Sequence, residues 1–150
     1  MKIHFTKKEY RLLLDMISIA EWVMNAYTTG DNSKSEPYEE LEQKILSYAK
    51  DYGVEDLIMH DERLNKYFPT GAYENEGAAR FFIEEFEEDV FWEELCSRLA
   101  RRDLLQEKGI ENLKAMDPVE RLTAEDEIAE QYSDEFVANG LKNIILSMKV

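Results

Sequence analysis

The sequence predicts a mainly α-helical protein, a single-domain bundle of about five helices around an apolar first helix. Apolar residues recur at spacings of three and four in several segments, which is the period of a helix. Helix start signals occur at Thr6 and at Asp117. The chain has 150 residues, of which 44% are apolar, so a domain of this length can bury a core without disulfides or metals.

The first helix is expected to run from about Lys7 to Thr28. Thr6 is the predicted N-cap, and Glu9 three residues later completes a capping box. Polar residues fall within an arc of roughly 120° on this helix, and apolar residues fill the rest. A surface helix needs a narrower apolar stripe. The helix is therefore predicted to be either the buried centre of the domain or part of an oligomer interface, with a homodimer as one form of the latter.

Three more helices are expected before residue 110. The second begins at Ser35 and ends at Gly53, with one apolar face that docks on the core. The third begins within residues 73–77, and the fourth begins near Asp89 and ends around Gly109. The pattern also allows one unbroken helix in place of the break before Asp89.

The last helix has the clearest boundaries. Asp117 is the expected cap, Pro118 occupies the first helical position and Glu120 the third, which is typical of a helix start. Asn139-Gly140 is the expected end.

Two regions lack helical periodicity or show alternation instead. Residues 54–70 are predicted to form either a two-stranded hairpin or a long ordered loop. Residues 2–5 and 144–150 alternate between apolar and polar positions. A lone strand leaves backbone groups unsatisfied, so a small β element that pairs these two terminal segments is expected.

Charge and cysteine content exclude several classes of function. The net charge of −15 disfavours binding to a bare phosphate backbone, so we expect no direct nucleic-acid contact. A single cysteine, Cys96, rules out an intramolecular disulfide and a Cys-rich zinc site, and it fits a reducing cytoplasm. No apolar run resembles a signal peptide or a transmembrane helix, so a cytoplasmic protein with no membrane contact is expected.

The excess of acidic residues is concentrated in residues 74–94, which hold nine acidic residues against Arg80 alone. This segment predicts an acidic surface for a basic protein partner. The alternative interpretation is a solvated helix face that keeps the protein soluble. No metal site is predicted, because the chain has neither the EF-hand spacing nor a Glu-x-x-His motif. The candidate partner-binding residues are Glu84, Glu85, Glu87, Glu88 and Asp89.

Catalytic motifs are absent from the sequence. There is no Gly-rich phosphate loop, no Gly-x-Ser-x-Gly and no His-Glu-x-x-His. His60 lies beside Asp61 and Glu62 in the irregular segment, and this loop is the weaker candidate site, since a histidine and a carboxylate can act as a general base. Cys96 is expected in the core.

The function predicted from these observations is a non-enzymatic protein-interaction or regulatory module with an acidic surface and no cofactor. A small-ligand or divalent-metal-binding domain is the alternative, and an enzyme of an unrecognised type is a third hypothesis. The cluster Arg98, Arg101 and Arg102 is expected to pair with the acidic last helix rather than with phosphate.

Overall fold

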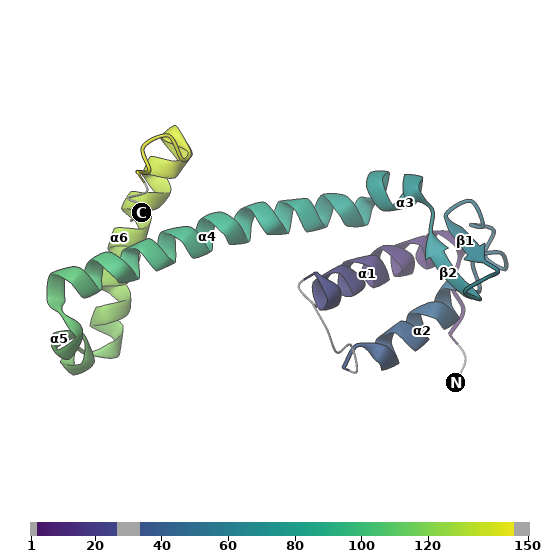
Figure 1. The fold of residues 1–150 in the computed structure, drawn as a ribbon, viewed down its shortest axis with the longest axis horizontal. Helices are drawn as coiled ribbons and strands as arrows, with labels where there is room; N and C mark the ends of the chain where they lie inside the picture. Colours follow the sequence, from purple (N-terminus) through teal and green to yellow (C-terminus); the bar gives the residue numbers. More distant parts are fainter. Residues whose placement is uncertain (1–2, 27–33, 146–150) are drawn as a thin grey trace. The chain divides into compact units, whose positions relative to one another are not determined.

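The computed structural model describes residues 3–26 and 34–145, and it confirms the mainly α-helical class (Figure 1). The chain divides into two compact units, residues 1–85 and 86–150. The elements are α1 (Lys7–Asn25), α2 (Glu36–Leu46), β1 (Ile58–Asp61), β2 (Lys66–Pro69), α3 (Gly71–Glu76), α4 (Ala78–Lys108), α5 (Ile110–Ala115) and α6 (Pro118–Asn139).

The core of the first unit lies between α1 and the chain that follows α2. Tyr10 and Leu14 of α1 are almost fully buried there. The Tyr10 ring stacks on Tyr52, with 4.2 Å between ring centroids, and its hydroxyl donates a hydrogen bond to the Ile45 carbonyl at 2.5 Å. Burial raises the pKa of Tyr10 to about 12, with smaller contributions from Tyr52 and Asp51. The other buried members of this core are Leu46, Ala49, Val54, Leu57 and Ile58.

Both predicted helix caps are confirmed. The Glu9 amide donates to Thr6 Oγ1 at 3.3 Å and the Thr6 amide donates to Glu9 Oε2 at 2.8 Å, so the capping box is complete. The hydrogen bond from the Thr6 backbone lowers the pKa of Glu9. Asp117 Oδ1 accepts the amides of Val119 and Glu120. The predicted last turn of α1, through Thr28, reaches beyond Ala26 and so lies outside the described residues.

The middle of the chain differs from the prediction in two places. Helix α2 ends at Leu46 instead of near Gly53, and residues 47–53 form turns that end at Gly53 with φ of 66°. Helix α4 runs without a break past Glu88 and Asp89, so the second of the two predicted alternatives is correct. The Asp89 side chain is exposed and leaves the helical backbone uninterrupted.

Among the described residues, the small sheet lies in the internal segment. β1 and β2 pair antiparallel, with His60 opposite Tyr67, so residues 54–70 contain the hairpin alternative. Residues 3–6 and 144–145 form no strand, and residues 146–150 lie outside the described part. A hairpin closes a short loop, whereas pairing residues near the two ends would close a loop of almost the whole chain at a higher entropic cost.

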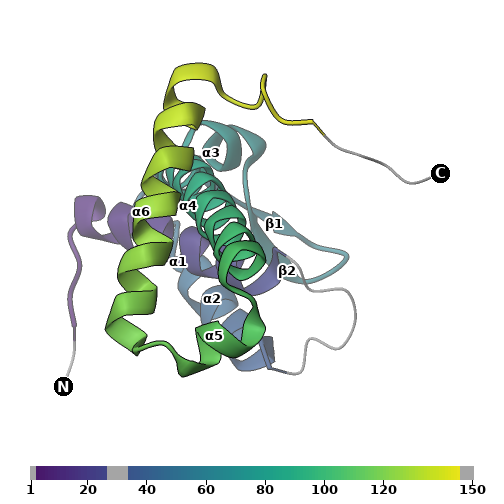
Figure 2. The same ribbon diagram turned by 90° about the vertical axis from the view of Figure 1, so that its left-hand side faces the viewer.

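The second unit consists of the later part of α4, α5 and α6. Figure 2 shows α5 linking the end of α4 to the start of α6. Gly109 precedes α5 with φ of 76°, a conformation that glycine adopts without strain. Cys96, Ala100 and Leu104 of α4 and Phe136 of α6 are buried. The predicted single domain stays a prediction, since α4 belongs to both units as one helix.

Helix α1 buries less of its apolar arc than a central helix would. Leu12, Met16 and Val23 are 54%, 67% and 59% exposed. Their spacings of four and seven place them on one face of α1. Among the described helices, none combines the length and apolar character needed to cross a membrane.

Leu14→Ala is expected to lower the free energy of unfolding by about 2–5 kcal/mol, because Leu14 is 1% exposed and its removal leaves a cavity. Leu12→Ala, on the same helix but largely exposed, is the matched control and should cost less than about 1 kcal/mol. Urea unfolding followed by circular dichroism measures both. Equal losses in the two variants would contradict this assignment of the core.

Candidate functional site

The acidic residues predicted to bind a partner all lie exposed on α4. Among them, Glu84 accepts a hydrogen bond from Arg80 Nε at 2.8 Å, and Glu88 accepts one from Trp92 Nε1 at 2.6 Å. Both contacts link positions four residues apart on the same helix. In the described part of the chain no ion pair engages the other members of the set, Glu85, Glu87 and Asp89. We refer to residues 84–89 as the acidic block.

The second predicted candidate, His60 with Asp61 and Glu62, lies at the end of β1 and in the hairpin turn. The His60 ring packs against Tyr67, with 4.6 Å between ring centroids. Asp61 Oδ1 accepts the amides of Arg63 and Leu64 at 2.8 and 3.2 Å. Asp61 therefore stabilises the turn, and its carboxylate oxygen is used by the backbone rather than by the imidazole.

A cavity in the first unit contains the most perturbed carboxyl group of the described residues. The cavity has a volume of about 660 Å³ and lies among α1, α2, β2 and the start of α4. Burial raises the pKa of Glu42 to about 7, and the charges of Glu21 and Glu39 add to this effect, while Lys66 opposes it. Lys66 also forms an ion pair with Glu39.

Side-chain hydrogen bonds hold the walls of this cavity together. Gln43 donates to the Tyr67 carbonyl at 2.9 Å and accepts the Tyr67 amide at 2.7 Å, which fixes α2 to β2. The Tyr73 hydroxyl donates to Asp15 Oδ1 at 2.7 Å. Burial raises the pKa of Tyr73, and the hydrogen bond to Asp15 raises it further. Gln43 and Tyr73 therefore have structural hydrogen-bond partners. Glu42 is a carboxyl group of the cavity with a pKa raised to about 7, close to neutral pH.

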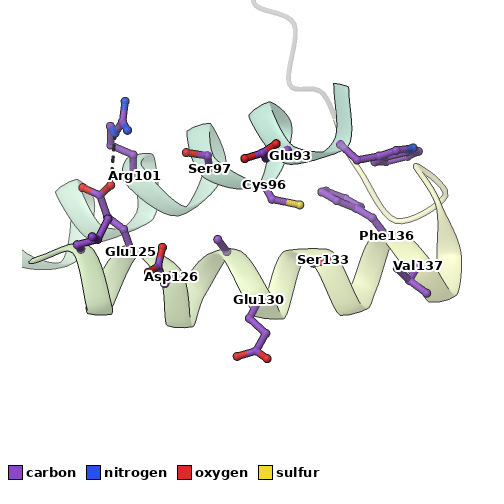
Figure 3. A pocket seen from close by; sticks show the side chains of 13 residues that line it. Glu93, Cys96, Ser97, Arg101, Glu125, Asp126, Glu130, Ser133, Phe136 and Val137 are labelled. Atoms are coloured by element: carbon purple, nitrogen blue, oxygen red, sulfur yellow. Dashed lines mark ion pairs between the residues drawn. The ribbon is translucent and has the colours of Figure 1, made fainter. Parts of the chain in front are cut away.

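A groove separates α4 from α6 in the second unit (Figure 3). Its volume is about 660 Å³. Cys96 and Phe136 project toward one another across the gap and are 7% and 8% exposed. The rings of Trp92 and Phe136 are 5.5 Å apart between centroids. Trp92, Cys96, Leu122, Ala129, Phe136 and Val137 are its apolar lining residues, and we call this site the α4–α6 groove.

The charged lining of the groove is mainly acidic. Glu93 comes from α4, whereas Glu125 and Asp126 come from α6. Arg101 forms an ion pair with Glu125 at 3.6 Å, drawn as a dashed line in Figure 3. The Glu125 side chain is 19% exposed and that of Arg101 is 67% exposed. Glu130 also lines the groove, but its carboxylate points away from α4.

The arginine cluster of α4 pairs with carboxylates in part as the sequence predicts. Arg101 reaches Glu125 of α6. Arg102 Nη2 donates to the Tyr132 hydroxyl of α6 at 3.0 Å, and Arg102 Nε lies 2.7 Å from Asp103 Oδ1. Arg98 instead pairs with Glu94 on its own helix at 2.8 Å. Two of the three arginines thus contact α6.

Cys96 is buried at the base of the groove, and burial raises the pKa of its thiol. Across the described residues, no group of three or more His, Cys, Asp or Glu side chains is arranged to hold a metal ion. The candidate site residues therefore remain the acidic block and the His60 turn.

The sequence does not predict the raised pKa of Glu42 or the α4–α6 groove. Glu42 is one of several glutamates in α2, and its pKa is raised mainly by burial in the folded unit, with a smaller contribution from Glu21 in another helix. Trp92 and Phe136 are large apolar residues in helical segments, a pattern that is the same for a filled core and for a groove, so the gap between their helices has no sequence signal. The comparisons of the chain with protein-family models, with curated proteins and with solved structures gave no match.

Glu42→Gln is expected to stabilise the protein at pH 8 by up to about 3 kcal/mol and to have little effect at pH 4. The folded-state pKa of about 7 exceeds the ordinary value of 4.5, so the folded state binds the extra proton and stability falls as the pH rises between these values. The glutamine variant lacks this loss. Urea unfolding at the two pH values measures it.

Glu40→Gln is the matched control, because Glu40 is exposed on the same helix. The control should change the free energy of unfolding by a similar small amount at both pH values. A Glu42→Gln variant that behaves like the control would show that Glu42 titrates as an ordinary surface carboxyl.

Proposed function

We propose that the chain is a protein-interaction module that presents the acidic block of α4 to a basic partner protein and catalyses no reaction. The observation that carries the proposal is the exposure of all five carboxylates of the block on one continuous helix. Complementary charge raises the rate and the specificity of association more than the final affinity. We also place the protein in the cytoplasm, where its single free thiol would stay reduced.

The contacts inside the block support binding rather than internal pairing. Glu84 and Glu88 make local contacts four residues away, which leave their remaining lone pairs accessible at the surface. Glu87 has no cationic neighbour within ion-pair distance in the described segments. Like charges three and four residues apart cost helix stability, and a basic partner would remove that repulsion.

Reversal of charge in the block tests the proposal. The triple variant Glu84→Lys, Glu87→Lys, Glu88→Lys should lose a partner that wild type retains from lysate at low salt and releases at moderate salt. The partner is identified by mass spectrometry, and its affinity is then measured with purified proteins. We expect the loss in affinity to exceed about tenfold.

The control variant Glu55→Lys, Glu127→Lys, Asp134→Lys changes the net charge equally at exposed positions outside the block. It should keep most of the affinity. Equal losses in both triple variants would show that total charge, and not the block, governs association. Binding of no specific partner at either salt concentration would favour the solvated-face interpretation.

A homodimer through α1 is a second proposal, and it depends on the exposed face formed by Leu12, Met16 and Val23. An apolar face of this kind is typical of an interface between helices. Light scattering at micromolar concentration should give twice the 17.7 kDa mass of one chain, and Met16→Glu should return it to one chain. A single-chain mass for the wild type would remove this proposal.

A further inference from the structure

We propose that the α4–α6 groove binds one amphipathic helix of the partner protein, with Lys and Arg on the polar face of that helix. The inference rests on the proposed function, which already requires a basic protein partner. The groove is the proposed binding site for a segment of that partner, and a basic amphipathic helix is the proposed kind of segment. All residues that line the groove belong to the second unit.

The groove has the length and the lining that a helix needs. Cys96 and Phe136 form a buried apolar base, and Leu122 and Val137 of α6 remain 59% and 86% exposed. These last two residues are fifteen positions apart, so they lie about 22 Å apart along α6. That distance spans about four helical turns. An amphipathic helix binds such a groove through apolar residues at i, i+3 or i+4, and i+7.

The charge of the lining selects a basic helix. Glu93 on one wall and Asp126 on the other are exposed carboxylates. Arg101 is the cation of the lining, and Glu125 already holds it at 3.6 Å. Asp89 lies one turn before Glu93 on α4, so negative charge continues along the same face beyond the groove. The partly exposed ring of Trp92 also favours Lys and Arg through cation–π attraction.

A second copy of the chain fits this groove poorly. In a twofold symmetric dimer the same surface meets itself, so Glu93 and Asp126 of one copy would face the carboxylates of the other. Like charges brought together across an interface cost affinity. The same carboxylates disfavour an acidic helix. A basic amphipathic helix covers the apolar base and neutralises the walls at the same time.

The test uses the full chain with Trp22→Phe, so that the fluorescence of Trp92 reports binding at the groove. The probe is a synthetic peptide of about five helical turns, ~18 residues, with Leu on one face and Lys on the other. Two control peptides accompany it. One has the same composition in scrambled order, and the other replaces each Lys by Glu.

The Lys-Leu helix should change the Trp92 emission and bind at least about tenfold more tightly than either control peptide. Val137→Glu and Asp126→Lys should each weaken it by about tenfold or more. Val119→Glu and Asp134→Lys are matched controls on α6. Val119 is 72% exposed, and neither control residue lines the groove. Both controls should bind the peptide as the wild type does.

Several results would overturn the inference. Equal binding of the scrambled peptide would show attraction to net charge alone, and preference for the Glu peptide would reverse the sign of the site. Unchanged binding in Val137→Glu and Asp126→Lys would place the peptide elsewhere. A change of mass in light scattering on Val137→Glu would identify a second copy as the occupant.

Peptide binding by the groove variants and partner binding by the block variant separately test the groove and the acidic block. If the groove variants bind the peptide normally while the triple variant of the acidic block loses its partner, the inference is wrong and the proposed function stands. If the groove variants lose the peptide while the block variant keeps the lysate partner, the groove binds a helix but the block is not the surface that recruits the partner.

Discussion

Helix α4 stays helical through the acidic block, and the residues that it buries on either side of the block depend on this local constraint. Ala79 and Ile83 are buried before the block, and Ala100 and Leu104 are buried after it, so one helix supplies apolar residues to each unit. Carboxylates at spacings of three and four oppose this continuity. The contacts from Arg80 to Glu84 and from Trp92 to Glu88 offset part of the repulsion by drawing two of the carboxylates toward a donor on the same helix.

The two proposed surfaces use different interactions, namely long-range electrostatic attraction and the burial of apolar surface at contact. The acidic block attracts a partner at a distance, because charge acts over roughly a Debye length of about 8 Å at physiological salt. The α4–α6 groove acts at contact, because its apolar base gains free energy only when water is excluded from it. A partner drawn by the first term and retained by the second would associate quickly and dissociate slowly. Neither term requires a catalytic residue.

Local signals in the sequence predicted local structure. Thr6 with Glu9 and Asp117 with Pro118 set helix starts through hydrogen bonds that close within four residues, so their spacing in the chain is sufficient evidence. The β hairpin was one of two alternatives, because its pairing depends on a turn that Asp61 and Asn65 complete. Its strands are four residues each, too short for periodicity to identify.

Features that join distant segments could not be predicted in the same way. The hydrogen bond from Tyr10 to Ile45 connects α1 to α2, and the stacking of Tyr10 on Tyr52 connects α1 to the turns that follow α2. The raised pKa of Glu42 needs burial by distant segments and the nearby charge of Glu21 from α1, and the groove needs the spacing of α4 and α6. The acidic block was found from composition alone, since exposure of a charged residue is the usual outcome.

The position of Cys96 makes the modification rate of its thiol a probe of solvent access to the interior of the second unit. The side chain is 7% exposed and its pKa is raised, so a thiol-specific reagent should react with it slowly in the folded protein. Local opening of the helix pair would raise the modification rate, and ordinary unfolding experiments average such a motion with the rest of the chain. A helix bound in the groove would cover the same sulfur and lower the rate.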